Sequence, residues 1–182
     1  EGKMSKPEEI YKFIYNYFSE RNVIKNKKLS ALVTAGPTRE YIDPVRFITN
    51  SSTGKQGYEI ANSLAKSGIK TTLISGPSML RKPENVKIVT VETADEMYAE
   101  TKKALPVNIA VCTAAVTDFK PEKYEEKKIK KDKLNLNLKR NIDILEFLSK
   151  NNSVRPDLVV GLAAETNDIL KFAEDKKNKK HC

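Results

Sequence analysis

The feature that most constrains the fold is a repeated alternation of short apolar runs with segments of helical pattern. The clearest runs cover residues 29–35, 70–75, 108–116 and 157–164, and glycine or other small residues lie at or just after their ends. Short apolar runs separated by helices are typical of strands buried in a parallel sheet. The alternation therefore predicts an α/β domain, a Rossmann-like three-layer fold with a mostly parallel central sheet and helices on both faces.

Helical segments are expected between these runs. One covers residues 7–18, a second begins at Ser52 and is stopped by Gly68, and a third is opened by Thr93 and runs to about Leu105. The remaining expectations are a strand at 86–91, a long loop at 37–52, a strand through Leu134, Leu136 and Leu138, a helix capped by Asn141, and a last helix opened by Asn167 or Asp168.

Composition excludes several classes of protein. The 182 residues fit one domain, and 39% hydrophobic with 31% charged residues suits a globular chain. No apolar run approaches a membrane span, and the amino end is too charged for a signal peptide. Cys112, Cys182 and His181 are the only cysteine and histidine residues, and too few to form a zinc site or a histidine-based catalytic triad. No metal-binding side chains are assigned. Two unpaired cysteines predict a reducing, cytoplasmic location.

The net charge of +9 is compatible with nucleic acid, an anionic membrane surface or a phosphorylated small molecule as partner. Most of this charge is expected to belong to a solvated, lysine-rich surface. Aromatic residues are not interleaved with the basic runs, and a stacking platform for single strands needs them. The lysines at 127–131 are either a solvated charge run or a basic loop beside a triphosphate. Lys176 and Lys180 are four residues apart, share a helix face, and could also reach phosphates.

Parallel sheets bind ligands at the carboxyl ends of their strands, and the distinctive residues of this chain follow those ends. Gly36 ends the first run. Ala114 and Ala115 are small enough for a planar base to lie against the backbone, and Asp118 could hold ribose hydroxyls or a hydrated metal ion. The alternative is that the alanines pack against helices and Asp118 caps a turn.

Residues 51–57 (SSTGKQG) precede a predicted helix. Free N–H groups at a helix start favour a phosphate, and Ser52 and Gly54 are small enough to let it approach. The spacing matches neither a Walker A loop nor the glycine fingerprint of dinucleotide-binding enzymes. The alternative is an ordinary helix start with Gly57 packed on the sheet.

Residues 43–50 lie inside the predicted long loop, and long loops in compact domains are usually functional. Arg46 could hold a carboxylate or phosphate by its forked donors, and Asn50 could donate to a carbonyl oxygen. The alternative is a loop stabilised by an Arg–Asp pair, with the asparagine in a turn.

Six segments together resemble the synthetase half of the bacterial bifunctional phosphopantothenoylcysteine decarboxylase/synthetases of coenzyme A biosynthesis. They are TAGPTREYIDPVRFITNSSTGKQG (34–57), SGP (75–77), TAAVTDF (113–119), KIKK (128–131), KRNIDIL (139–145) and GLAAET (161–166). The resemblance implies that residues 1–28 are the end of the decarboxylase half plus a helix and linker. Residues 29–182 would then be the synthetase domain, lacking its C-terminal strands.

The resemblance implies a phosphopantothenate–cysteine ligase. CTP and Mg²⁺ would activate 4′-phosphopantothenate as an acyl-cytidylate with release of pyrophosphate, and cysteine would then form the amide and release CMP. It also implies a homodimer, a decarboxylase half in the same full-length chain, and no FMN on this segment. Neither nucleic acid nor membrane is an expected partner.

The resemblance also implies roles for matching residues. Asn50 would polarise the acyl carbonyl in the second step, Lys128 would contact the triphosphate in the first, and Arg46 lies in the same catalytic block. The expected nucleotide contacts are Gly36, Ser52, Gly54, Ala114, Ala115, Asp118, Lys128, Lys176 and Lys180, with Ile142, Asp143, Ile144, Leu145 and Leu162 around the cytosine.

Two positions depart from the family pattern. Ile142 stands where the family usually has proline, and Leu162 stands where an aromatic residue commonly follows the glycine. Both bear on the choice between CTP and the ATP that eukaryotic relatives favour. Two competing functions remain, an NAD(P)-dependent oxidoreductase, which the absent glycine fingerprint disfavours, and a basic nucleic-acid-binding module.

Overall fold

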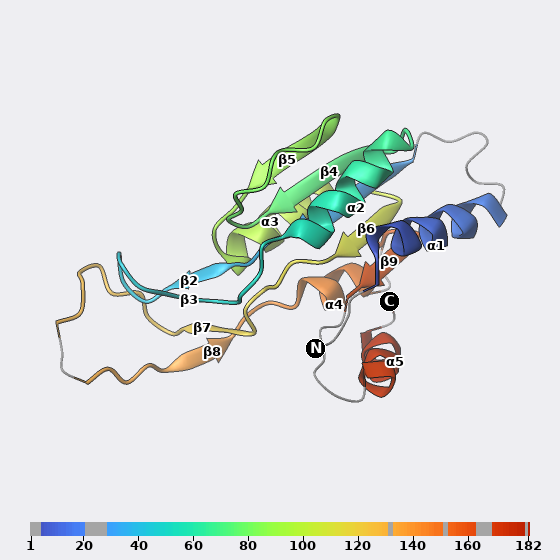
Figure 1. Cartoon of the computed structure of the whole chain (residues 1–182). Coiled ribbons are helices and arrows are strands. Elements are labelled where there is room, and N and C mark those ends of the chain that lie inside the picture. The colour runs from blue at the N-terminus through green and yellow to red at the C-terminus, as the bar shows by residue number, and fades with distance from the viewer. Residues whose placement is uncertain (1–4, 21–28, 131–132, 151–152, 163–168, 181) are drawn as a thin grey trace.

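The computed structural model describes residues 5–20, 29–130, 133–150, 153–162, 169–180 and 182. Its centre is a five-stranded sheet of order β5-β4-β1-β6-β9 (Figure 1), in which every neighbouring pair is parallel. The strands are β1 Ser30–Ala35, β4 Lys70–Ser75, β5 Val86–Thr90, β6 Ile109–Cys112 and β9 Leu158–Gly161. The predicted parallel sheet is confirmed.

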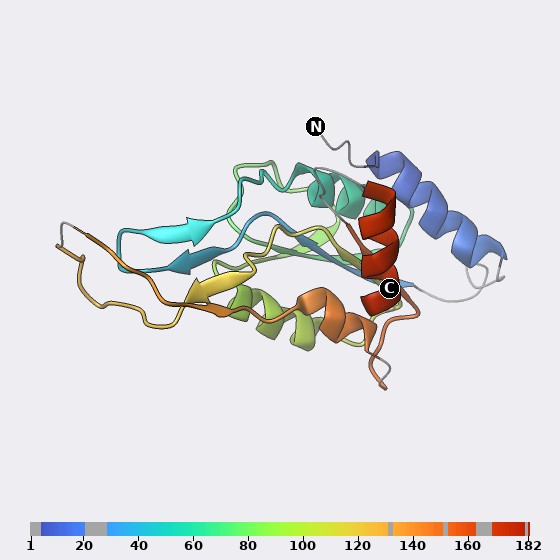
Figure 2. The ribbon, with the colours of Figure 1, turned by 90° about the horizontal axis from the view of Figure 1, so that it is seen from below.

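Helices cover both faces of this sheet (Figure 2), which confirms the three-layer arrangement. The helices are α1 Pro7–Glu20, α2 Lys55–Lys66, α3 Ala94–Ala104, α4 Ile144–Ser149 and α5 Ile169–Lys180. On one face, α1 and α2 pack with Val33 of β1 in a single buried cluster. On the other face, α3 and α4 pack with the adjacent Leu32. Successive strand residues thus serve opposite faces, which is why β1 reads as a continuous apolar run. No helix among the described residues is long and apolar enough to cross a membrane.

Local sequence signals set most helix boundaries. Thr93 opens α3 with a capping box, since its hydroxyl accepts the N–H of Glu96 at 3.2 Å and the Glu96 carboxylate accepts the N–H of Thr93 at 3.4 Å. Gly68, with φ +80°, follows the end of α2 as predicted. The prediction that Asn141 caps the next helix is wrong, because Asp143 caps α4. Asn167 and Asp168 lie outside the described residues.

Two antiparallel hairpins extend from the sheet as arms (Figures 1 and 2). The first arm pairs β2 Arg39–Tyr41 with β3 Phe47–Thr49, and the second pairs β7 Phe119–Pro121 with β8 Leu138–Arg140. The prediction of a long loop at 37–52 is therefore wrong at residues 39–41 and 47–49, which form strands. The strands in this segment are only three residues long, and the buried residue of β2 is the charged Glu40. The sequence therefore shows no alternation of apolar and polar residues that would predict them.

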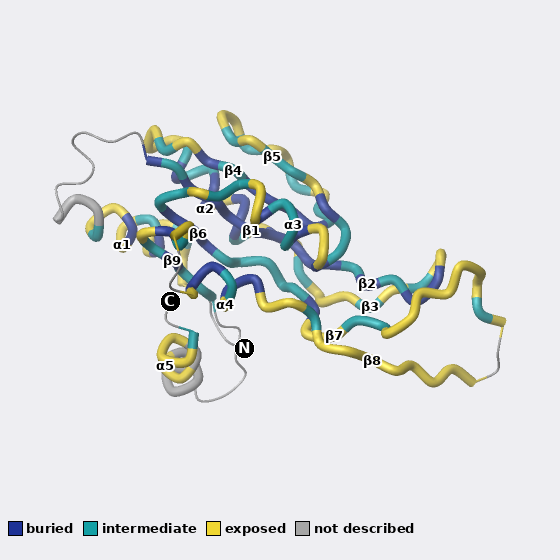
Figure 3. The backbone as a smooth tube through the Cα atoms, turned by 180° about the vertical axis from the view of Figure 1, so that it is seen from behind, coloured by how far each residue is buried: buried dark blue, intermediate teal, exposed yellow. Residues whose placement is uncertain are grey.

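The predicted strand through Leu134, Leu136 and Leu138 is also mostly wrong, because only Leu138 belongs to β8. Strand pairing covers Leu138 to Arg140, and one further backbone bond follows it, from the N–H of Glu122 to the carbonyl of Asn137 at 3.0 Å. The three leucines remain exposed, and Figure 3 shows β8 as an exposed strand beside the buried sheet.

Three glycines allow close backbone contact at the carboxyl edge of the sheet. A Cβ on Gly54 would lie 3.0 Å from the nitrogen of Gly36, and one on Gly76 would lie 1.7 Å from the carbonyl oxygen of Pro37. Because these contacts involve backbone atoms, no side chain can move aside to make room. The start of α2 is therefore held directly against the end of β1.

Gly76→Ala is expected to lower the free energy of unfolding by about 3 kcal/mol, because the new methyl group overlaps the Pro37 carbonyl. Urea unfolding measures the change. Gly68→Ala is the matched control, since it has no atom within 4 Å and meets only the strain of positive φ, with an expected cost of about 1 kcal/mol. Equal losses in the two variants would contradict the packing argument.

Candidate active site

An open cleft of about 1110 Å³ lies at the carboxyl ends of β1 and β6. Thr34 and Cys112, which are neighbours in the strand register, both line it. The chain adds β4 and β5 on one side of β1, and β6 and β9 on the other. The cleft therefore lies at the point where the strand order reverses, the usual ligand site of an open parallel sheet.

Five parts of the chain supply the rest of the lining. Residues 114–119 follow β6, residues 140–146 lead into α4, Leu162 follows β9, and Asn50 and Ser51 follow β3. From α5 come Asp175, Lys179 and Lys180. The cleft thus gathers the following predicted site residues: Asn50, Ala114, Ala115, Asp118, Ile142, Asp143, Ile144, Leu145, Leu162 and Lys180.

Backbone and side-chain hydrogen bonds fix the floor of the cleft. The N–H of Ala115 donates to the carbonyl of Gly36 at 2.9 Å, which places Gly36 beneath the lining without making it part of the lining. Asn141 donates from Nδ2 to the carbonyl of Thr117 at 2.9 Å and from its backbone N–H to the carbonyl of Asp118 at 2.8 Å. Asn141 therefore joins the two loops that line the cleft, a role that sequence reasoning missed.

The side of the cleft predicted for the base combines apolar and charged groups. Ile144 and Leu145 are buried, whereas Ile142 is exposed. Asp143 accepts the N–H of Glu146 at 2.9 Å and also forms an ion pair with Lys180 of α5. Lys180 thus lines the cleft, and Asp143 neutralises part of its charge.

Asn50 stands between the cleft and a smaller hollow. Its Nδ2 donates to the carbonyls of Ala115 at 3.2 Å and Val116 at 3.1 Å. Asn50 and Ser51 line both the cleft and the hollow, which has a volume of about 350 Å³. The side chain of Asn50 can therefore contact one ligand in the cleft and another in the hollow.

The smaller hollow lies before the start of α2. Ser52 lines it and accepts the N–H of Gly54 at 3.2 Å, while Gly54 adopts φ +80°. The N-cap residue Gly54 has no side chain, and the hydroxyl of Thr53 accepts only the N–H of Lys55, at 3.4 Å. The positive end of the helix therefore still favours an anion. The alternative prediction for Gly57 also holds, because a Cβ there would lie 2.5 Å from that of Ala35.

Arg46 and Lys128 are not among the residues that line the cleft. Arg46 forms an ion pair with the buried Asp43, as the structural alternative for this loop predicted. Lys128 is exposed beside Ile129, which contacts Asp43 and Arg46 on the first arm. The side chain of Lys176 lies outside the described part of the structure.

Comparison with known proteins agrees with this geometry. The family model for the DNA/pantothenate metabolism flavoprotein C-terminal domain matches residues 26–182. This chain belongs to that family.

Curated relatives and solved structures give the same assignment. The chain is 41% identical over 183 residues to the coenzyme A biosynthesis bifunctional protein CoaBC of Haemophilus influenzae, covering 99% of this chain and 45% of that protein. It is 38% identical over 179 residues to CoaBC of Bacillus subtilis, covering 96% of this chain and 44% of that protein. The chain thus spans slightly under half the length of these relatives.

The crystal structure of the C-terminal domain of a CoaBC superposes with a TM-score of 0.71 at 36% identity, covering 86% of this chain and 76% of that one. A Cab2 mutant in complex with phosphopantothenate-cysteine shares the fold, with a TM-score of 0.68 at 16% identity and coverage of 97% and 78%.

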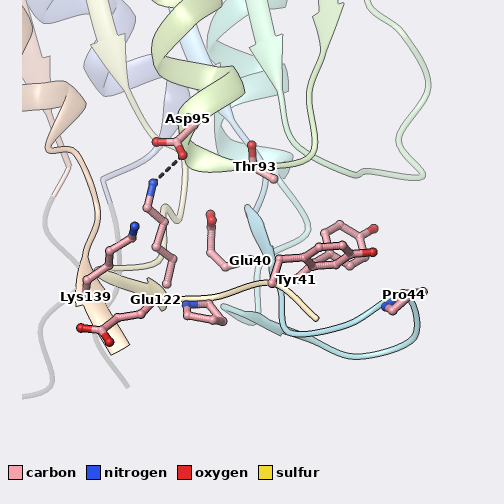
Figure 4. Close-up of a pocket in the computed structure, with 10 residues that line it drawn as sticks. Glu40, Tyr41, Pro44, Thr93, Asp95, Glu122 and Lys139 are labelled. Carbon is pink, nitrogen blue, oxygen red and sulfur yellow. Dashed lines mark hydrogen bonds and ion pairs between the residues drawn. The ribbon is translucent and has the colours of Figure 1, made fainter. Parts of the chain in front are cut away.

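A third hollow in this chain lies between the arms and the start of α3 and has a volume of about 610 Å³ (Figure 4). None of the predicted site residues lines it. Glu40 is buried and accepts the N–H of Ala94 at 2.9 Å, and Asp95 forms an ion pair with Lys120. Glu40 and Asp95 thus already have hydrogen-bond or ion-pair partners within the chain. The cleft at β1 and β6 remains the candidate active site.

The Asp43 carboxylate gives the domain a specific response to acid. The Arg46 guanidinium and three backbone N–H groups hold the pKa of Asp43 well below its usual range, against the opposing effect of burial. A lowered folded-state pKa adds stability above the unfolded pKa of about 4, and that stability is lost as pH falls below it. The free energy of unfolding of Asp43→Asn should therefore lie below that of the parent by a constant amount from pH 5 to 8.

Below about pH 4 the two free energies should converge. Urea unfolding at several pH values tests this, with Asp157→Asn, an exposed aspartate that accepts one bond from Asn108, as control. A gap between parent and Asp43→Asn that stays constant down to pH 3 would contradict the assignment.

Proposed function

We propose that this chain is a phosphopantothenate–cysteine ligase of coenzyme A biosynthesis. The observation that carries the proposal is the place of Asn50, between a cleft suited to a nucleotide and a hollow suited to an anionic acid. The curated relatives are named as coenzyme A biosynthesis proteins, which agrees with this substrate class.

The nucleotide, CTP, occupies the cleft. Its base lies beside Ile142 and Leu162, against the backbone of Ala114 and Ala115, and Asp118 accepts bonds from the ribose hydroxyls. Lys180 leaves Asp143 for the phosphates, because a triphosphate carries more negative charge than one carboxylate. Lys176 lies four residues before Lys180 on the same helix and adds a second cation.

The phosphorylated acid occupies the smaller hollow, with its carboxylate directed toward Asn50. Ser52, Gly54 and the N–H groups at the start of α2 bind its oxygens. In the first step a carboxylate oxygen attacks the α-phosphorus, and the bond to pyrophosphate breaks. In the second step the amine of cysteine attacks the acyl carbon, CMP leaves, and one proton is released. Neither step needs a nucleophile from the protein.

Mg²⁺ is proposed to enter with the triphosphate, whose oxygens supply most of its ligands. No side chain of the protein is assigned to the ion, since Asp118 is proposed to bind the ribose hydroxyls. When bound, the ion neutralises charge on the transferred phosphoryl group. Within the described ranges no group of three or more His, Cys, Asp or Glu side chains could hold a metal ion.

The arms are proposed to form a homodimer interface. Val45, Phe47 and Tyr124 are exposed on them, together with the three leucines before and within β8. Large apolar side chains gathered on one exposed region are typical of protein interfaces. Sedimentation of the parent and of a Leu136→Glu variant tests this, with a dimer expected for the first and a shift to monomer for the second. A parent chain that sediments as a monomer would rule the interface out.

The full-length protein is proposed to be cytoplasmic and to carry the decarboxylase, with its FMN, outside residues 29–182, because the curated relatives are bifunctional and about twice as long. Residues 1–28 are assigned to the end of that half and its linker.

Mass spectrometry of a mixture of the chain with 4′-phosphopantothenate, cysteine, CTP and Mg²⁺ tests the ligase proposal. The expected products are phosphopantothenoylcysteine and CMP in equal amounts. Nicotinamide-dependent absorbance change, or salt-sensitive binding to DNA or RNA without turnover, would instead support the competing oxidoreductase or nucleic-acid-binding functions.

A further inference from the structure

The turn of the first arm is organised by one buried carboxylate. Asp43 is fully buried, and its Oδ1 accepts the N–H groups of Val45 and Arg46, both at 2.9 Å. Its Oδ2 accepts Nε of Arg46 at 3.0 Å and also Nη2 of the same guanidinium. The two side chains therefore form a fixed unit, here called the clamp, in which the fork of Arg46 is oriented by Asp43.

The clamp holds a single residue of the lysine-rich segment by both of its backbone groups. The N–H of Ile129 donates to Oδ2 of Asp43 at 3.1 Å, and the carbonyl of Ile129 accepts Nη2 of Arg46 at 2.8 Å. A second attachment lies four residues earlier, where the N–H of Glu125 donates to the carbonyl of Ile42 at 3.0 Å. Lys128 therefore immediately precedes Ile129, the residue at which its loop is fixed.

The same arm carries Asn50 at its other end. β3 ends at Thr49, whose hydroxyl donates to the carbonyl of Thr38 at 2.7 Å and ties the two strands of the arm together. Asn50 follows and bonds to the carbonyls after β6. One hairpin therefore connects the residue proposed for amide formation with the loop proposed for nucleotide activation.

We propose that Asp43 and Arg46 are positioning residues, which fix the lysine-rich loop at Ile129 and thereby set where Lys128 stands relative to the arm that bears Asn50. Arg46 then acts through Lys128 and does not bind substrate itself, and Asp43 acquires a role that the sequence did not indicate. This inference rests on the proposed function only for its effect on turnover. The attachment of the loop is a property of the ligand-free chain.

Limited trypsin digestion without ligands tests the attachment. Cleavage after Lys127, Lys128 and Lys130 should be about tenfold faster in Asp43→Asn, because release of Ile129 raises the population of the open loop. Ile129→Ala is the matched control and should be cleaved at the parent rate, since the two hydrogen bonds from the clamp go to backbone atoms of Ile129.

An unchanged cleavage rate in folded Asp43→Asn would overturn the attachment. If this variant does not fold, Arg46→Lys replaces it, since lysine keeps the charge but loses the fork that spans Asp43 and Ile129. The same tenfold acceleration is expected there.

A double-mutant cycle tests the effect on turnover. Pyrophosphate release in a single turnover is measured for Arg46→Lys, Lys128→Gln and the double variant. If Arg46 acts through Lys128, the double variant should be no slower than Lys128→Gln alone. Multiplicative losses would instead assign Arg46 to the substrate directly and overturn the positioning role. Absence of turnover in the parent would refute the proposed function, and the digestion experiment would still decide whether the clamp exists.

Discussion

Asn50→Ala should leave pyrophosphate release from CTP at the parent rate while slowing amide formation by about 100- to 1000-fold, the usual effect of removing one donor to a developing oxyanion. The reason is the place of Asn50 on the wall shared by the cleft and the smaller hollow. Its Nδ2, which bonds to the carbonyls of Ala115 and Val116, is the proposed donor to the acyl oxygen. Rapid-quench measurement of both half-reactions separates the two rates.

Asn62→Ala on α2 is the control for the same chemical change, because Asn62 lies beside neither ligand site. Equal slowing of both half-reactions in Asn50→Ala would mean that Asn50 serves only to tie the arm to the end of β6. Normal amide formation would remove it from the reaction.

Lys128→Gln should slow the first half-reaction by about 100-fold, because a cation at the triphosphate stabilises charge that develops on the leaving pyrophosphate. The expected loss is large even though Lys128 is exposed and does not line the cleft. The measurement is the single-turnover rate of cytidylate formation with enzyme in excess.

Lys123→Gln removes the same charge from the same segment, and Lys123 is also exposed. This control should react at the parent rate. If the two glutamine variants behave alike, Lys128 is a solvated surface charge, as the competing interpretation of the basic run holds.

The central sheet was predictable because its inner strands β1 and β6 are buried on both faces, so each reads as a continuous apolar run. The run at 70–75 coincides with β4, and the run at 29–35 contains β1. The predicted strand at 108–116 is too long, since β6 ends at Cys112. Ala114 and Val116 read as strand residues because they are apolar, but the structure uses them to line the cleft.

The arms were not predictable from periodicity. Their strands are three residues long, and β8 is exposed along its whole length, so burial imposes no alternation on them. Two polar residues hold the first arm in place through partners far away in the sequence. Glu40 of β2 bonds to the start of α3, and Asp43 at the turn bonds to Ile129. Such contacts depend on tertiary structure, which a local pattern does not encode.

The candidate site was predictable where small or polar residues follow a strand end. Ala114, Ala115 and Asp118 line the cleft for this reason. Asn141 was missed because an asparagine before an apolar segment predicts a helix cap, whereas here Asp143 caps α4 and Asn141 joins two loops. Arg46 was placed near the chemistry by its position in a conspicuous segment, although the structure pairs it with Asp43.

Pyrophosphate release in the absence of cysteine tests the central claim most directly. The chain is mixed with Mg²⁺ and either CTP or ATP, with and without 4′-phosphopantothenate, and cysteine is added afterwards. The account predicts release with CTP only when 4′-phosphopantothenate is present, and CMP only after cysteine is added. Pyrophosphate release that does not depend on 4′-phosphopantothenate, or none with either nucleotide although the nucleotide binds, would contradict it.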